Sequence, residues 1–265
     1  MRVAVLITGQ LRDYKINALN QIKHLIEPNS ADVFVYACTK NTLHTCGENI
    51  VQNYKITTER DPEDLRGEIK TIYGKYLKQS KINETEDLDD AGFGTIGYFR
   101  KRMQNQMDNI REGFNMATAY SKKNSFEYDV VVRCRPDNSI FLHRVDLSKF
   151  PIEENEVYAT QYYTGHRDPW FFSFSRPKTF QKYCSLKYLD GVDDARTDND
   201  FLCPETAMEH YLHYEQKIKL KYVLDMCLTF TEYDKTRPIR DFPYRDKTAH
   251  LIDHNGNFVD QVEPV

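Results

Sequence analysis

Residues 128–141 have the sequence YDVVVRCRPDNSIF, in which a short apolar run changes abruptly to charged and turn-forming residues. Three consecutive valines favour a buried strand. Pro136 ends such a strand because proline donates no main-chain hydrogen bond, and a carboxylate follows at once. The stretch therefore predicts a buried strand that delivers Arg133, Arg135 and Asp137 to the edge of a sheet.

These charged residues have two interpretations. Open α/β sheets bind ligands beyond the carboxyl ends of their strands, so charges placed there reach a ligand cleft. The same residues also fit a strand-end ion pair followed by an ordinary Asp-Asn-Ser turn. Both interpretations stay open on this stretch alone.

A first buried strand is predicted at residues 3–8, and it ends in the turn Gly9-Gln10-Leu11-Arg12. The turn would place main-chain N–H groups and the Arg12 guanidinium at the carboxyl edge of the sheet, where a phosphate could bind. It lacks the spaced glycines of a dinucleotide site and the Gly-Lys pair of a phosphate-binding loop. The alternative is a simple turn with a surface arginine.

Alternating elements follow along the chain. Apolar residues at helical spacing, namely Ile16, Leu19, Ile22 and Ile26, predict a helix over 14–26, and residues 32–37 predict a second strand. A strand, a helix and a strand in that order form the unit of a parallel sheet.

Two more helices are predicted in the first half. Asp61 and Pro62 are typical of a helix start, and this helix would extend to about residue 76. The helix over 98–120 has the clearest apolar stripe, made of Met103, Met107, Ile110, Phe114 and Ala117. Arg100 at its start opposes the helix dipole, a small cost that a bound anion would offset.

The second half alternates in the same way. Strands are predicted at 156–161, 170–175 and 219–230, and helices at 177–189 and 203–214. Between the first two strands, residues 162–168 combine tyrosines with Asp168, residue types that bind the faces and hydroxyls of sugars. No repeat or linker appears, so we expect a single domain over 1–265.

Composition limits the classes of function. The net charge of −4, from 36 basic and 40 acidic residues, gives no field of the kind that nucleic-acid binders use. No apolar run approaches a membrane span, which predicts a protein without a transmembrane segment that stays in a cytoplasm. The six cysteines contain no Cys-x-x-Cys pair, so we expect reduced thiols and neither zinc nor disulfides.

Taken in order, several of these motifs resemble the GT-A-fold glycosyltransferases found in bacterial surface-polysaccharide clusters and large DNA viruses of algae. The motifs are Gly9–Arg12, Asp32–Val35, the helix at 98–120, residues 128–137 and Pro204-Glu205. The resemblance reaches about Phe230. It implies one α/β domain with a mixed, mostly parallel sheet flanked by helices, a nucleotide-binding half at 1–135, and an acceptor half with a C-terminal tail at 136–265. If the source is viral, the location would be the host cytoplasm.

The resemblance implies transfer of a sugar from a nucleotide-diphosphate sugar to a glycan or glycoprotein acceptor. In this family an Asp-x-Asp motif holds a divalent cation, and the matching triplet here is Arg135-Pro136-Asp137. Asp137 would hold Mn²⁺ or Mg²⁺ with few other protein ligands, or Arg135 would replace the metal. The residues expected to bind the donor are Thr8, Gly9, Gln10, Arg12, Arg100, Arg133, Arg135 and Asp137.

An inverting transferase of this kind also needs a base to deprotonate the acceptor hydroxyl. Glu205 lies where the family commonly carries that base, with Asp168 and Asp200 as competitors; His250 would be a late metal ligand. The first turn of a helix is an equally natural place for Glu205. A non-catalytic GT-A-like binding or assembly module and a sugar nucleotidyltransferase stay open as alternatives, as do the donor sugar, the acceptor, and inversion against retention.

Overall fold

The structure of the chain is a computed structural model. It describes residues 1–11, 14–45, 54–83, 96–136, 140–141, 143–161, 167–186, 208, 211–224, 227–228 and 250–252. The strands are β1 (Val3–Gln10), β2 (Asp32–Cys38), β3 (Lys40–Thr45), β4 (Tyr54–Glu59), β5 (Leu77–Asn83), β6 (Val130–Cys134), β7 (Ile140–Phe141), β8 (Glu156–Gln161), β9 (Arg167–Ser175), β10 (Lys219–Leu224), β11 (Cys227–Leu228) and β12 (His250–Ile252).

Four α-helices accompany these strands within the described ranges: α1 (Tyr14–Gln21), α2 (Pro62–Tyr73), α3 (Ile96–Lys123) and α4 (Pro177–Tyr183). Helix α1 continues as a wider turn over Ile22–Ile26, where the Glu27 N–H donates to the carbonyl of Ile22 at 2.9 Å. Helix α2 begins as its sequence predicts, because the Asp61 side chain accepts from the N–H groups of Glu63 and Asp64.

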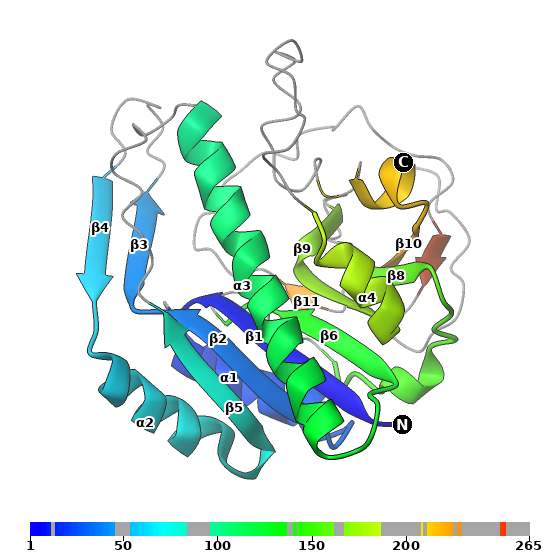
Figure 1. Cartoon of the computed structure of the whole chain (residues 1–265), viewed down its shortest axis with the longest axis horizontal. Coiled ribbons are helices and arrows are strands. Elements are labelled where there is room, and N and C mark those ends of the chain that lie inside the picture. The colour runs from blue at the N-terminus through cyan, green and yellow to red at the C-terminus, as the bar shows by residue number, and fades with distance from the viewer. Residues whose placement is uncertain are drawn as a thin grey trace.

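Eight strands form one sheet in the order β12-β10-β8-β9-β6-β1-β2-β5 (Figure 1). Strand β9 is antiparallel to both of its neighbours, β6 and β8, whereas the other neighbouring strands pair in parallel. The predicted α/β class with a mixed, mostly parallel sheet is confirmed. Strands from residues 1–135 and from residues 136–265 join this one sheet through the β6–β9 pair.

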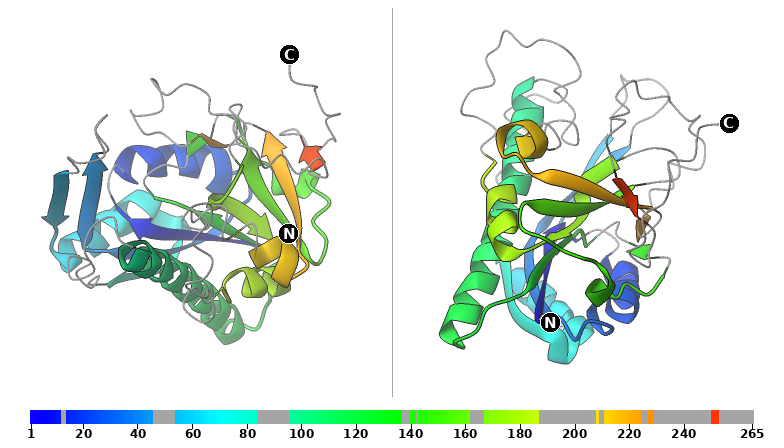
Figure 2. Two further views of the ribbon diagram at one scale, coloured as in Figure 1. Left: turned by 90° about the horizontal axis from the view of Figure 1, so that it is seen from above. Right: turned by 90° about the vertical axis from the view of Figure 1, so that its right-hand side faces the viewer.

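Helices cover both faces of the sheet (Figure 2). Apolar side chains of α1 and α2, including Leu25 and Ile69, pack with Val5 of β1 on one face. Those of α3 and α4, including Ile110 and Phe180, pack on the other. The central strands β1, β2 and β6 are apolar on both faces, so they need both layers of helices to exclude water.

The stripe predicted for the long helix lies against the sheet from Met107 to Ala117, and the side chain of Met103 lies outside the described residues. Met107, Ile110 and Ala117 are fully buried, and Phe114 packs beside them. The approach is closest at Gly113, where an added Cβ would lie 2.8 Å from Cγ2 of Thr8 in β1. A glycine is therefore required for α3 to pack this close to the end of β1.

Several predicted boundaries were wrong. The helix expected at 177–189 ends at Tyr183, and the strand expected over 219–230 is two strands, with β10 in the large sheet and β11 paired with β7. Strands β3, β4, β5 and β12 were not predicted. Strand β5 has the sequence LKQSKIN, whose polar residues suit the edge position that it occupies but hide it from a search for apolar runs.

The buried face of α1 also differs from the prediction. Leu19 of the predicted apolar stripe is 66% exposed, and the face that packs inward carries Tyr14, Asn17, Ala18, Gln21 and, in the following turn, Leu25. Two of these are amides because the helix packs on main-chain carbonyl groups as well as on apolar side chains, as described below.

Cys38, Cys134 and Cys184 are buried cysteines that form no disulfide in the part of the chain that the structure describes. Within the parts of the chain that the structure describes, no helix has the length and apolar character needed to cross a membrane.

Candidate functional site

The carboxyl ends of β1 and β6 meet near the middle of the sheet. Strand β1 pairs with β2 on one side and with β6 on the other, so the strand order reverses between β1 and β6. In open α/β sheets such a reversal opens a crevice beyond the strand ends, and ligands bind there. We take the ends of β1 and β6 as the candidate site.

The structure brings two of the predicted ligand segments together at this point. Gly9, near the end of β1, has φ of +128°, a backbone conformation that favours glycine. A Cβ at Gly9 would lie 3.7 Å from Cδ of Pro136, the residue after Arg135. The last residues of β1 and Pro136 of the Arg-Pro-Asp triplet therefore lie close together.

Thr8 and Gln10 flank Gly9 on β1. Thr8 is buried on the face covered by α3, and within the described residues its hydroxyl has no hydrogen-bond partner. Gln10 is half-buried at the end of the strand and pairs with Cys38 of β2. Both residues stand at the edge where the sequence predicted donor binding.

The two arginines of the central strand differ in accessibility. Arg133 is 0% exposed and lies between Leu6 of β1 and Ser173 of β9. Arg135 follows the strand and is half-buried. Of the two, Arg135 is the one placed to reach a ligand beyond the strand ends, whereas the Arg133 guanidinium belongs to the interior.

Asp168 lies at the same edge of the sheet. Because β9 is antiparallel to its neighbours, its first residues lie where the parallel strands end: Arg167 pairs with Gln161, the last residue of β8, and Asp168 pairs with Thr160. The sequence placed Asp168 in a loop before the strand, but its backbone is part of β9. Its side chain is outside the description.

The remaining predicted residues are not brought to this point by described contacts. Arg12, Asp137, Asp200 and Glu205 lie outside the described residues, and Arg100 belongs to α3 with its side chain not described. His250 begins β12 and pairs with Lys221 of β10. Four strand spacings, about 19 Å, separate β12 from β6.

No three His, Cys, Asp or Glu side chains lie together as possible metal ligands in the part of the chain whose side chains are described. A divalent cation here would rest on Asp137, the carboxylate that follows Pro136, together with ligand oxygens and water. Mg²⁺ accepts such sites with one or two protein carboxylates.

Sequence reasoning missed a set of amides on α1. The Asn17 side chain donates to the carbonyl of Pro136 at 3.1 Å, and the Gln21 side chain donates to the carbonyl of Arg135 at 2.8 Å. Asn20 bonds both main-chain groups of Phe141. The signal was present in the sequence, because positions 17, 20 and 21 share one face of a helix.

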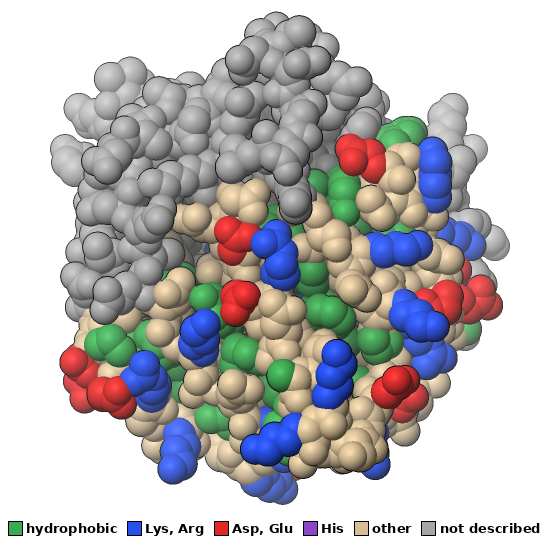
Figure 3. All heavy atoms as spheres, in the orientation of Figure 1, with side chains coloured by type: hydrophobic (Ala, Val, Ile, Leu, Met, Phe, Trp, Pro, Cys, Tyr) green, Lys and Arg blue, Asp and Glu red, His purple; other side chains and the backbone are tan. Residues whose placement is uncertain are grey.

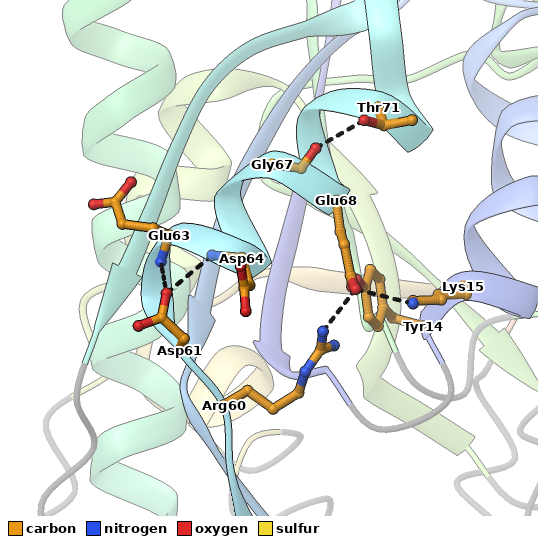
Figure 4. Close-up of polar contacts among 9 residues, drawn as sticks. All are labelled: Tyr14, Lys15, Arg60, Asp61, Glu63, Asp64, Gly67, Glu68 and Thr71. Carbon is orange, nitrogen blue, oxygen red and sulfur yellow. Dashed lines mark hydrogen bonds and ion pairs between the residues drawn. The ribbon is translucent and has the colours of Figure 1, made fainter.

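The start of α1 is held by a polar network with α2 (Figure 4). Glu68 of α2 accepts from Tyr14, from Lys15 at 3.1 Å and from Arg60 at 2.7 Å. The bond from Arg60 is the largest of the causes that lower the pKa of Glu68 to about 2. Burial is the largest cause that raises the pKa of Tyr14 to about 12, and the hydrogen bond to Glu68 is the second. The network holds the first residues of α1, which is the next helix after β1, against α2.

Charges of both signs are scattered over the described part of the face covered by α3 and α4, as Figure 3 shows. Lysine and arginine side chains alternate there with aspartate and glutamate. On the described part of this face, positive and negative side chains are therefore mixed and not separated by sign.

A scan against models of known protein families found no match to this chain, and a search among curated proteins found no significant match either.

Proposed function

We propose that the protein is a glycosyltransferase of the GT-A type that moves a sugar from a nucleotide-diphosphate sugar to a glycan or glycoprotein acceptor. The donor's diphosphate would bind beyond the ends of β1 and β6. The observation that supports this most is the closeness of Gly9 to Pro136 at the point where the strand order reverses.

The site offers the chemistry that this transfer needs. In the reaction the bond between the sugar and the diphosphate breaks, a bond from the acceptor oxygen to the sugar forms, and the acceptor proton goes to a base. Arg135 would stabilise the negative charge on the departing nucleoside diphosphate. A divalent cation, held by Asp137, would supply further positive charge to the same group.

The base would come from one of the carboxylates predicted for that role. Glu205 is the first candidate from the family resemblance, and Asp168 is the second because the backbone of β9 carries it to the same edge as Arg135. The base must lie within hydrogen-bond reach of the acceptor hydroxyl. Loss of the true base should lower kcat far more than it changes donor affinity.

The test is turnover with UDP-, GDP-, CDP- and dTDP-sugars in the presence of Mn²⁺ or Mg²⁺. We expect one donor to release its nucleoside diphosphate, and we expect the rate to fall at least about tenfold in Arg135→Ala and in Asp137→Ala. Arg144→Ala is the matched control, since Arg144 is exposed on the segment after β7.

The released product separates the enzyme classes. A sugar nucleotidyltransferase would instead join a nucleoside triphosphate to a sugar 1-phosphate and release pyrophosphate. Pyrophosphate release in that second assay, without turnover of any nucleotide sugar, would assign the protein to the nucleotidyltransferases. Glu205→Ala and Asp168→Ala would be compared at saturating donor. The variant that loses kcat is the one that lacks the catalytic base. Turnover that is equal in the wild type and in all these variants would refute the proposed site.

A further inference from the structure

Helix α1 directs three amide side chains at the chain segment that follows β6. Asn17, Asn20 and Gln21 lie at relative positions i, i+3 and i+4, and so they share one face of the helix. Their partners are the main-chain carbonyl groups of Pro136, Phe141 and Arg135 respectively, at 3.1, 3.1 and 2.8 Å. The partners are at least 114 positions away in sequence, so these bonds are tertiary contacts.

Two of these amides are buried, which makes their bonds costly to break. Asn17 is 3% and Gln21 is 0% exposed, and a buried amide without a partner is strongly unfavourable. Tyr73 of α2 donates to Oε1 of Gln21 at 3.2 Å. That bond orients the Gln21 amide so that its N–H group faces the carbonyl of Arg135.

Asn20 holds the far end of the segment in the way a neighbouring strand would. Its Nδ2 donates to the Phe141 carbonyl at 3.1 Å, and its Oδ1 accepts from the Phe141 N–H at 2.7 Å. The amides thus supply hydrogen bonds to main-chain groups where the segment leaves the sheet. Both ends of the segment are fixed to one rigid helix.

We propose that Asn17, Asn20 and Gln21 are positioning residues, which hold Arg135 against the end of β1 so that its guanidinium meets the donor's diphosphate. The inference rests on the proposed function for its ligand. It explains why a helix in the core layer presents amides inward while Leu19 faces solvent. The effect on ligand binding would pass through Arg135, since the hydrogen bonds described above join the amides to main-chain atoms of the segment.

A neighbouring asparagine separates positioning from general stabilisation. Asn29 is half-buried and makes similar bonds further along the chain, donating to the carbonyl of Val145 at 2.8 Å and accepting from the N–H of Leu147 at 2.9 Å. It does not contact Arg135 or Pro136 through any bond that the structure describes. Asn29→Ala is therefore a control that removes comparable bonds away from the site.

The experiment measures the Kd of UDP and of GDP, each with Mn²⁺, for a double-mutant cycle of Asn17 and Arg135. We expect Asn17→Ala and Gln21→Ala each to weaken binding about tenfold, equivalent to about one hydrogen bond, and Asn29→Ala to change it less than about twofold. In the Arg135→Ala background, Asn17→Ala should have almost no further effect on Kd.

Hydrogen exchange of the Phe141 amide provides a measurement that needs no ligand. Asn20→Ala should accelerate this exchange at least about tenfold, because it removes the acceptor of that N–H. Unchanged exchange would show that the amides do not hold the segment. Faster exchange with unchanged Kd in all three amide variants, or additive effects of Asn17→Ala and Arg135→Ala, would overturn the positioning role.

Failure of the proposed function gives a different pattern. If the wild type bound neither UDP nor GDP, the link to the donor would be refuted, and the exchange of Phe141 would still decide whether the amides hold the segment. If the Asn17 and Gln21 variants fail to fold, the half-buried Asn20 supplies the variant for both measurements.

Discussion

The contact between α3 and the end of β1 predicts that Gly113→Ala destabilises the protein, although alanine is the better helix former. An added Cβ would lie 2.8 Å from Cγ2 of Thr8 and 3.7 Å from Cβ of Leu6. Favourable carbon–carbon contacts lie at about 3.5–4.0 Å, so one atom must move. Thr8 is 1% exposed and β-branched, which leaves its methyl group little freedom to do so.

Two terms set the size of the effect. Alanine in place of glycine stabilises a helix by about 1 kcal/mol, whereas overpacking a core costs about 1–3 kcal/mol. Because the clash is with a stiff side chain, we expect the upper part of that range, and hence a net loss of about 1–2 kcal/mol in the free energy of unfolding. Urea denaturation followed by circular dichroism measures this directly.

A double-mutant cycle and a matched glycine test the reasoning. In the Thr8→Ala background, Gly113→Ala should become stabilising by about 1 kcal/mol, a coupling of about 2–3 kcal/mol. Gly67 of α2 has no atom within 4 Å of an added Cβ, so Gly67→Ala should stabilise by about 1 kcal/mol. The reasoning is refuted if Gly113→Ala stabilises as Gly67→Ala does, or if the two effects in the cycle simply add.

Three further predictions follow from buried or coupled polar groups. Arg60 lowers the pKa of Glu68 from 4.5 to about 2, so the stabilisation is present above pH 4.5 and is lost as the pH falls towards 2. Because Glu68 is 30% exposed, solvent screens part of this effect. From about pH 6 to about pH 3, the free energy of unfolding measured in urea should fall by only about 1 kcal/mol more in the wild type than in Glu68→Gln, and an equal fall in both would contradict this. Thr8→Val, which replaces a buried hydroxyl lacking a partner among the described residues, should raise the free energy of unfolding by about 1 kcal/mol, and a loss would reveal a partner. Lys221→Met should cost about 3 kcal/mol because it removes the nearer partner of the buried Glu156 carboxylate, at 2.6 Å, and leaves it the exposed Lys219 at 3.7 Å. The added change Glu156→Leu should recover most of this loss, and no recovery in urea unfolding would show that the pair stabilises in another way.

The sequence predicts those elements whose local pattern matches their burial. Strands β1, β2 and β6 consist mostly of apolar residues and are buried on both faces, and α3 has an apolar stripe over Met107, Ile110 and Ala117. Most of the buried positions of each of these segments are apolar, so the spacing of apolar residues alone identifies it. The start of α2 was predictable for a similar reason, since Asp61 caps its own helix.

The features that local patterns do not reveal depend on residues far away in the chain. The inward face of α1 is polar at Asn17 and Gln21 because it meets the main chain of Arg135 and Pro136, which no pattern within residues 14–26 records. The antiparallel direction of β9 is likewise set by its neighbours β6 and β8. That direction carries the backbone of Asp168 to the edge of the sheet where β1 and β6 end.

Part of the candidate site was predictable and part was not. The sequence identified Gly9 and Arg135 separately, as a turn after one strand and a charge after another. Their adjacency follows from the pairing of β1 with β6. The burial of Arg133, by contrast, depends on the helix layer that covers its face of the sheet, and strand alternation alone leaves open whether such cover exists.

The most direct test of the central claim, that the ends of β1 and β6 bind a nucleoside diphosphate, is a thermal-shift panel. UDP, GDP, CDP and dTDP and their sugars would be compared with and without Mn²⁺ on the wild type, Arg135→Ala and Asp137→Ala. A ligand that binds only the folded state stabilises it by about 2.7 kcal/mol at a hundredfold excess over Kd. This stabilisation raises the Tm. We predict that nucleotides with one particular nucleobase raise the Tm of the wild type most, and that this increase is lost in both variants. No shift with any nucleotide, or an equal shift in all three proteins, would contradict the claim.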